Sequence, residues 1–277
     1  MIELRGLTKR FGDFTAVDGL SFEIGTGEFF GLLGPNGAGK TTTISMLSTV
    51  LLPSSGEILI DGTRLTRAAS EQKSKLAVIT QEYSMRQDMT VAEVMEYQGR
   101  LYYMPKKEIK RKSEELLGFA GLQDLRRRTV RHLSGGMKRK LMVCRALLTD
   151  PEILLLDEPT AGMDALSRRQ MWNLLRQVND SSKTILLTTH YIEEAEALCD
   201  RVAMINSGRL QKLDSPQALI KELGAYTVDE TGDDGLRSTH FTEREEAIRY
   251  LEGAAADSTL RQTTLEDVFI DAAGRGL

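Results

Sequence analysis

Uninterrupted apolar runs alternate along most of the chain with stretches in which apolar residues recur at helical spacing. Residues 29–33 form the first such run and predict a buried strand, followed by a helix over residues 41–52. Further buried strands are predicted at residues 76–80, 153–156, 184–189 and 202–205, and further helices at residues 137–147, 167–178 and 192–198. This alternation predicts an α/β fold with a mostly parallel sheet, whose functional groups should collect where the strands end.

The stretch between the first strand and its helix matches a phosphate-binding loop. It reads Gly34, Pro35, Asn36, Gly37, Ala38, Gly39, Lys40, Thr41, the pattern G-x-x-x-x-G-K-[ST]. Glycines let the backbone N–H groups curl around a phosphate, and the start of a helix adds a positive dipole end. Lys40 would reach the β- and γ-phosphates, and the Thr41 hydroxyl would contact Mg²⁺. The ordinary alternative, a Gly-rich turn that happens to contain Lys-Thr, is disfavoured by the flanking strand and helix.

The remaining segments predict additions to a P-loop NTPase core over residues 1–215. Residues 2–4 and 20–24 alternate apolar with polar positions, which indicates N-terminal antiparallel strands. Helical spacing predicts an inserted helical subdomain at about residues 85–148, in which the charged run 106–115 is a solvated helix face. Beyond it, residues 216–277 predict a small α+β domain with strands at 226–228 and 237–241 and helices at 243–251 and from 263.

The start of the last helix can be read in two ways. Thr263 and Glu266 have capping-box spacing, and Thr264 with Asp267 offers the same pairing one residue later.

Composition excludes few classes of protein but limits the kinds of partner that we expect the chain to bind. The 277 residues carry a net charge of −4, so nothing draws the whole chain to nucleic acid. Cys144 and Cys199 lie in helical patterns, which predicts two reduced, buried thiols. No run approaches the roughly 18–20 apolar residues of a membrane helix, and the first residues lack the apolar segment of a signal peptide. We therefore expect a soluble chain that serves any membrane process through a separate partner.

Several polar residues follow the predicted strands. Asp157 and Glu158 end an aliphatic strand, where an acidic pair is costly to bury unless a cation or a bound water uses it. The functional interpretation gives Asp157 to Mg²⁺ and makes Glu158 the base that polarises the attacking water. Its alternative is a solvated pair at a turn. His190 and Gln81 follow two other predicted strands, and His190 would point toward the same site. The alternative for His190 is a residue that caps the next helix, and the alternative for Gln81 is an ordinary polar loop residue. Phe11 could be a plain core aromatic.

The stretch Leu133-Ser134-Gly135-Gly136 also has two interpretations. It can be a helix start in which Ser134 is the N-cap. The same serine hydroxyl, bare backbone N–H groups and helix N-terminus can equally form a second anion site. A single nucleotide site rarely uses two such helix starts from one chain.

These residues, taken in order, resemble the ATP-binding-cassette (ABC) family over about residues 1–215. The set comprises Phe11, the loop at 34–41, Gln81, residues 133–137, residues 153–158, Ala161-Gly162-Met163-Asp164 and His190. The family implies that two cassettes pack head to tail, and that each ATP lies between the phosphate loop of one and the Ser-Gly-Gly signature of the other. That arrangement accounts for two anion sites in one chain.

Residue by residue, the resemblance implies one site on this chain. Phe11 would stack on adenine, and the loop from Gly34 to Thr42 would hold the phosphates of ATP. Gln81 would approach Mg²⁺ and the attacking water and would sense the membrane partner. Glu158 would be the catalytic base, and His190 would touch the γ-phosphate.

The resemblance also implies groups that act on the ATP of the other cassette. Ser134, Gly135 and Gly136 would contact its γ-phosphate, and Asp164 would couple the two sites across the interface. The sequence departs from the family at Met137, where many cassettes carry Gln; the donors named above do not depend on that side chain.

A finer resemblance is to ATPase subunits of exporters for daunorubicin-type drugs, nodulation factors or sodium. The signature Ser134 to Arg139 and the ending Leu265-Glu266-Asp267-Val268-Phe269 carry it. It implies a homodimer that hydrolyses ATP with Mg²⁺ at the cytoplasmic face of the membrane, bound to separately encoded integral membrane subunits. The alternative is a soluble ABC ATPase that acts on nucleic acid or the translation machinery. Only the basic cluster Arg126-Arg127-Arg128 with Arg131 favours it, and no nucleic-acid partner is expected.

Overall fold

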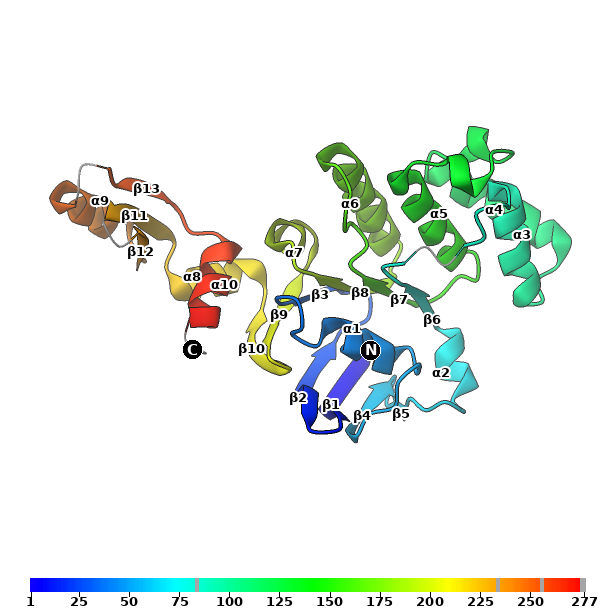
Figure 1. The fold of residues 1–277 in the computed structure, drawn as a ribbon, viewed down its shortest axis with the longest axis horizontal. Helices are drawn as coiled ribbons and strands as arrows, with labels where there is room; N and C mark the ends of the chain where they lie inside the picture. The colour runs from blue at the N-terminus through cyan, green and yellow to red at the C-terminus, as the bar shows by residue number, and fades with distance from the viewer. Residues whose placement is uncertain (83–84, 233–234, 255–256, 275–277) are drawn as a thin grey trace.

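The computed structural model describes every residue except 83–84, 233–234, 255–256 and 275–277. An α/β core occupies the middle of the molecule, a group of helices lies on one side, and the C-terminal part extends on the other (Figure 1). Among the described residues, no helix has the length and the apolar character needed to cross a membrane.

The core contains a six-stranded sheet in the order β10-β9-β3-β8-β7-β6. Neighbouring strands are parallel throughout, except that β10 runs antiparallel to β9. This confirms the predicted α/β core with a mostly parallel sheet. The strands are β3 (Phe29–Leu33), β6 (Leu76–Ile79), β7 (Ile153–Asp157), β8 (Thr184–Thr189), β9 (Arg201–Asn206) and β10 (Arg209–Asp214).

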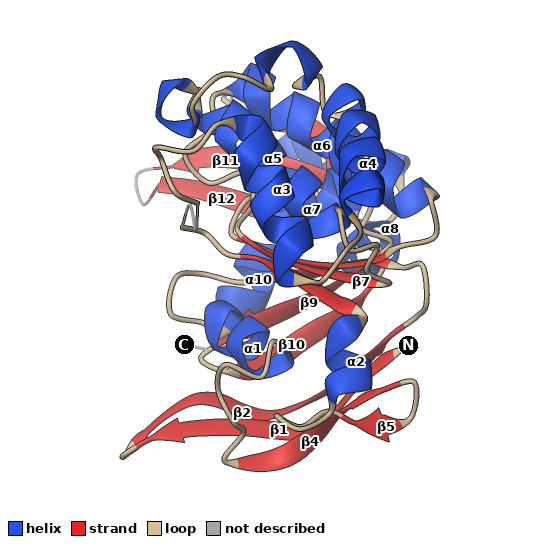
Figure 2. Cartoon of the chain, turned by 90° about the vertical axis from the view of Figure 1, so that its right-hand side faces the viewer, coloured by secondary structure: helices blue, strands red, loops and turns tan. Residues whose placement is uncertain are grey.

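Side chains of the sheet alternate between two apolar cores, one on each face. Leu154 and Leu156 pack with helices on one side, whereas Ile153 and Leu155 pack with the N-terminal strands and α1 on the other. Because both faces are covered, the strands can be continuously apolar. Figure 2 places most helices above this sheet and α1 with the antiparallel strands below it. The helices against the sheet are α1 (Lys40–Leu47), α5 (Gly135–Leu147), α6 (Ala165–Asp180) and α7 (Ile192–Leu198).

The predicted N-terminal antiparallel strands form a second sheet in the order β2-β1-β4-β5. Its apolar face, with Ile2, Leu4 and Leu20, packs over Ile44 and Leu47 of α1. The backbone N–H of Asp18 donates to the carbonyl of Gly208, which fastens this sheet to the turn after β9. Its strands are β1 (Ile2–Phe11), β2 (Phe14–Ile24), β4 (Ser55–Ile60) and β5 (Thr63–Arg64).

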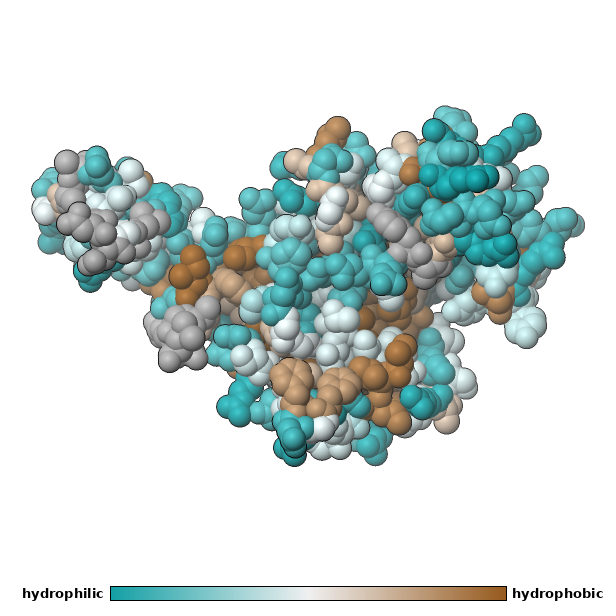
Figure 3. All heavy atoms as spheres, in the orientation of Figure 1, coloured by the Kyte–Doolittle hydropathy of each residue, from teal (hydrophilic) through white to brown (hydrophobic). Residues whose placement is uncertain are grey.

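The region between β6 and β7 is helical, as its spacing predicted. Thr90 and Glu93 form a capping box at the start of α3. Hydrophilic residues cover most of the surface of this region, at the upper right of Figure 3, which agrees with a solvated face on α4. The region contains α3 (Val91–Leu101), α4 (Lys106–Phe119), the 3₁₀ turns Gln123–Leu125 and Val130–His132, and α5.

The C-terminal part combines a small antiparallel sheet with two docking helices. The sheet has the order β12-β11-β13, and α9 packs against it. Leu265 and Val268 of α10 join the same apolar core as Leu198 of α7 and Leu219 of α8. The elements are α8 (Pro216–Leu223), β11 (Tyr226–Gly232), β12 (Gly235–Phe241), α9 (Arg244–Gly253), β13 (Thr259–Gln262) and α10 (Leu265–Gly274). The domain boundaries proposed from the sequence stay predictions.

Some elements differ from the sequence-based expectation. The helix expected to reach residue 52 is wrong in length, because α1 ends at Leu47. Thr49 takes a left-handed backbone (φ 60°), and the N–H of Leu51 donates to the carbonyl of Ser45, so the chain turns before Pro53. Five elements described by the structure were not predicted: α2 (Ser70–Ser74), β5, β10, α8 and β13. Of these, α8 is amphipathic, and its apolar side chains, with Leu219 buried, pack on the core. Both cysteines are buried and unbridged, as expected.

An ion cluster ties α10 to the small sheet. The guanidinium of Arg261 donates to both carboxylate oxygens of Asp229, at 2.6 and 3.2 Å, and to both of Asp267, at 2.7 and 2.8 Å. Asp267 also accepts from the N–H and the hydroxyl of Thr264, so the pairing of Thr264 with Asp267 forms and starts α10. Burial opposes ionisation of Asp267, but these hydrogen bonds outweigh it and lower its pKa from 3.8 to about 2.

We expect Asp267→Asn to lower the free energy of unfolding at pH 7 by about 2 kcal/mol, because a depressed acid pKa stabilises the folded state. This contribution is present above pH 3.8 and is lost as the pH falls toward about 2. Urea unfolding at both ends of that range measures it. Glu266→Gln, an exposed neutralisation at the adjacent position, is the control. Equal unfolding midpoints for the two variants would contradict the assignment.

Candidate functional site

The phosphate loop Gly34 to Thr41 joins β3 to α1, and close backbone contacts leave no room for a side chain at two of its glycines. Gly39 has a φ of 103°, and a Cβ there would lie 2.5 Å from the carbonyl oxygen of Ala16. A Cβ on Gly34 would lie 2.4 Å from the carbonyl oxygen of Ile205. The buried side chain of Lys40 curls back, and its Nζ donates to the carbonyls of Gly34 (2.8 Å) and Pro35 (3.0 Å). The loop is therefore a closed turn with its cation inside.

Asp157, the last residue of β7, lies against the start of α1. Its Oδ1 accepts from the hydroxyl of Thr188 at 2.6 Å and from the hydroxyl of Thr41 at 3.2 Å. The carboxylate is 4% exposed, so it is not a solvated turn residue. A carboxylate beside a hydroxyl is the oxygen donor set that Mg²⁺ prefers, and these two residues fit that ion.

Three of the residues predicted from the sequence contact a fourth, Glu158. Its Oε1 lies 3.2 Å from Nδ1 of His190 and 3.6 Å from Nζ of Lys40. Its Oε2 accepts from Nε2 of Gln81 at 3.5 Å. The side chain of Glu158 is 12% exposed, and its carboxylate gathers a buried ammonium together with an imidazole and an amide that are open to solvent.

The backbone of Glu158 is held in an unfavourable conformation. Its φ of 47° lies in the left-handed region, which costs a non-glycine residue roughly 1–2 kcal/mol. The N–H of Glu158 donates to the carbonyl (3.1 Å) and to the hydroxyl (3.2 Å) of Thr188 on β8. These bonds offset the strain and aim the carboxylate away from β7, toward the phosphate loop.

A cavity of about 530 Å³ lies over this group. It is lined by Phe14, Ala16, Asn36, Gly37, Gly39, Lys40, Thr41, Thr42, Gln81, Glu158, Ala161 and His190. Its size suits a small-molecule ligand. Because the phosphate loop and Glu158 both line the cavity and Lys40 lies 3.6 Å from the carboxylate, a ligand with phosphates on the loop would bring them close to Glu158.

Other sequence-predicted residues do not line this cavity. Ser134 caps α5, where its hydroxyl accepts from the N–H of Met137 at 3.2 Å. Asp164 caps α6 and accepts from the N–H and the hydroxyl of Ser167, hydrogen bonds that lower its pKa. A Cβ on Gly136 would lie 3.1 Å from Oγ of Ser167, so these two helix starts are neighbours. They form a second group of exposed N-termini, separate from the cavity.

The hairpin aromatic of the cavity differs from the one that the resemblance named. Phe11 and Phe14 face each other across the turn between β1 and β2, and they are 47% and 64% exposed. Phe14 lines the cavity, whereas the Phe11 ring lies under the ammonium of Lys9 at 5.2 Å. The sequence analysis did not single out Phe14; an exposed aromatic beside a tight turn is the signal that it offered.

Sequence reasoning also missed Glu194. It is 0% exposed, and its Oε1 accepts from the Thr160 hydroxyl at 2.8 Å and from Nε1 of Trp172 at 3.0 Å. Burial raises its pKa above the usual range, although the hydrogen bonds oppose this shift. The contacts join the loop after Glu158 to α6 and α7. A glutamate in an acidic helix is normally expected to be solvated, so little in the sequence indicates that Glu194 is buried.

Fold and site together define a nucleoside triphosphatase of the phosphate-loop class. Residues 17–161 match the ABC transporter family, and the chain belongs to that family, as an ATP-binding subunit that hydrolyses ATP.

Two relatives have names that describe export or drug resistance. The chain is 43% identical to Nod factor export ATP-binding protein I of Ralstonia nicotianae, over 84% of this chain and 73% of the relative. It is 35% identical to daunorubicin resistance ATP-binding protein DrrA3 of Streptomyces coeruleorubidus, over 99% and 96%.

Two solved cassettes share the fold. One is cbiO1 of Clostridium perfringens, part of an ABC transporter complex, with 26% identity and a TM-score of 0.74 over 80% of this chain and 90% of that one. The other is a dimeric ATP-binding cassette with ADP and phosphate bound, with 26% identity and a TM-score of 0.69 over 78% and 98%.

Proposed function

We propose that this chain is the ATP-hydrolysing subunit of an ABC exporter, in which ATP binding, dimer closure and hydrolysis move separate membrane subunits. The convergence of Lys40, Gln81 and His190 on the Glu158 carboxylate carries the proposal for hydrolysis. The names of both relatives, one for Nod factor export and one for daunorubicin resistance, support export.

In this proposal the chain's own groups position ATP and one water. When ATP binds, the ammonium of Lys40 gives up its hydrogen bonds to the carbonyls of Gly34 and Pro35 and donates to phosphate oxygens instead. The charged oxygens are better acceptors for an ammonium. Glu158 accepts the proton of the attacking water, and His190 orients that carboxylate and touches the γ-phosphate. Thr41, Gln81 and Asp157 would hold Mg²⁺, which would neutralise charge on the β- and γ-phosphates.

A second copy of the chain would complete each site. Ser134, Gly135, Gly136 and Asp164 do not line the cavity that contains the phosphate loop, yet they present helix N-termini suited to a phosphate. A head-to-tail homodimer brings them onto the ATP of the partner copy, and two-fold symmetry then makes two equivalent sites. The dimeric cassette of the same fold, with ADP and phosphate bound, supports the formation of a dimer.

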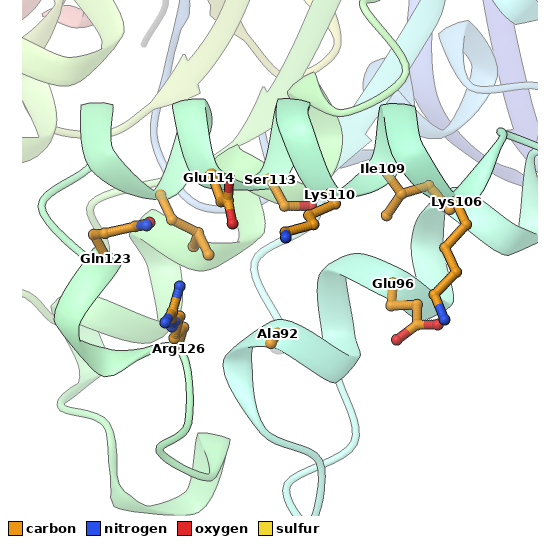
Figure 4. Close-up of a pocket in the computed structure, with 10 residues that line it drawn as sticks. Ala92, Glu96, Lys106, Ile109, Lys110, Ser113, Glu114, Gln123 and Arg126 are labelled. Atoms are coloured by element: carbon orange, nitrogen blue, oxygen red, sulfur yellow. The ribbon is translucent and has the colours of Figure 1, made fainter.

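The membrane subunits would contact the groove beside Gln81 and residues 82–104, of which 83–84 lie outside the described residues, and would hold the chain at the cytoplasmic face. On α3 and just after it, Tyr97, Leu101, Tyr102 and Tyr103 are more than half exposed. A cavity of about 260 Å³ lies between α3 and α4 (Figure 4). Its floor includes Ile109, and Lys106, Glu96 and Arg126 stand at its edge, a mixture that suits a protein segment.

The soluble alternative receives less support. Arg126, Arg127, Arg128 and Arg131 are exposed, but the relatives are named for export and resistance. A salt-dependent affinity for RNA or DNA that disappears when these arginines are neutralised would favour the alternative.

We expect Glu158→Gln to lower kcat at least about a hundredfold while ATP still binds, because the amide cannot accept the proton of water. With ATP, the variant should elute as a dimer in size-exclusion chromatography. Glu152→Gln, an exposed carboxylate just before the same strand, is the control and should hydrolyse ATP as the parent does. Comparable rates for Glu158→Gln and the parent would refute the assignment.

The hairpin aromatics give a paired test of base recognition. We expect Phe11→Ala to weaken ATP binding roughly tenfold, since base stacking contributes about 1–3 kcal/mol, and to leave the affinity for inorganic triphosphate unchanged. Phe14→Ala is the matched variant, and fluorescence titration measures both. A larger ATP-specific loss in Phe14→Ala would move the base contact from Phe11 to Phe14.

If membrane subunits dock on this surface, changes there should weaken their binding without reducing ATP hydrolysis. Replacing Tyr97 and Leu101 by Ser should reduce the integral membrane protein that copurifies from detergent-solubilised membranes, with ATP hydrolysis of the isolated chain unchanged. Exposed Val50 and Leu52, replaced in the same way, are the control. If the parent chain recovers no integral membrane protein, the export proposal fails.

A further inference from the structure

The side chain of Arg139, on α5, donates hydrogen bonds to backbone carbonyls at the end of β6. Its side chain is 2% exposed; Nη1 donates to the carbonyl of Thr80 at 2.7 Å, and Nη2 donates to the carbonyl of Gln81 at 2.8 Å. A buried guanidinium is costly unless acceptors satisfy it, and two consecutive carbonyls match its planar fork. The contact therefore fixes where the chain leaves β6.

Gln81 uses its two ends for different contacts. Its carbonyl is held by Arg139, whereas its side-chain amide donates to Oε2 of Glu158. Because a side chain leaves from its own backbone, a shift of the carbonyl would move the amide relative to the carboxylate.

The helix that carries Arg139 begins at Ser134. Five residues of α-helix span about 7.5 Å, so the guanidinium and the helix start belong to the same short, rigid segment. A movement of the start of α5 must therefore either carry the backbone of Gln81 with it or break two charge-assisted hydrogen bonds.

We propose that Arg139 is a positioning residue that links the Ser134–Gly136 helix start to Gln81. Contact of that helix start with the ATP of the partner copy then holds the amide of Gln81 in its place beside Glu158 in the copy that makes the contact. This inference rests on the proposed function, and it adds a mechanical connection within one chain between the two sites of the dimer.

A double-mutant cycle on kcat tests the connection. Arg139→Met and Gln81→Ala should each lower kcat roughly tenfold, and the combined variant should be no slower than Gln81→Ala, because Arg139 acts through Gln81. Multiplied losses in the combined variant would overturn the proposal, since a merely structural arginine would slow hydrolysis whether or not Gln81 is present. Lys140→Met, on the same helix but bonded to Gln170 of α6, is the control and should keep the parental kcat.

Two further measurements keep the test decisive. If Arg139→Met fails to fold by circular dichroism, the cycle is run with Arg139→Lys, which keeps the buried charge but not the two-pronged contact; the same two outcomes apply. In the Glu158→Gln background, Arg139→Met should still bind ATP and form the dimer. If Glu158→Gln alone forms no dimer, the proposed function fails; if only the combination fails to dimerise, the positioning role of Arg139 fails.

Discussion

The structure is organised by the need to hold the Glu158 carboxylate, largely shielded from water, beside the ammonium of Lys40. A charge in such a place is stable only with partners, and here three partners, Lys40, Gln81 and His190, come from three separate segments. They meet because β3, β6, β7 and β8 are parallel, so that their carboxyl ends share one edge of the sheet. The sheet therefore serves mainly to align the ends of its strands.

The same edge concentrates local strain and the contacts that sustain it. Glu158 adopts a left-handed backbone, and Thr188 of the neighbouring strand holds both its N–H and the carboxylate of Asp157. Glu194, buried beneath this edge, accepts from Thr160 and Trp172 and so fixes the loop that follows Glu158. The residues proposed to carry the chemistry thus depend on hydrogen bonds from Thr160 and Thr188 and on the buried acid Glu194.

Sequence reasoning reached the elements whose signal is local. The phosphate loop, the buried strands and the alternation with helices can all be read from short windows. It missed the early end of α1, because nothing in the apolar spacing marks the left-handed backbone of Thr49. It also failed where the decisive contact joins distant segments, since Phe14, Glu194 and Arg139 acquire their roles only from neighbours far along the chain. An arginine between two lysines in a basic helix start carries no mark that it will be buried against the carbonyls of Thr80 and Gln81.

The two helix starts at Ser134 and Asp164 explain how a closed dimer could reopen. In the chain described here their side chains satisfy helix N–H groups, contacts that stabilise a helix by about 1 kcal/mol each. A phosphate brought by a partner copy would compete for the same donors, and its charge-assisted hydrogen bonds are roughly twice as strong as the neutral one that the Ser134 hydroxyl accepts. Once hydrolysis removes that phosphate, the side chains can cap their helices again, so the two copies lose little by separating. In the proposed dimer, closure would then be favoured only while the γ-phosphate is present, which is the property that a transport cycle needs.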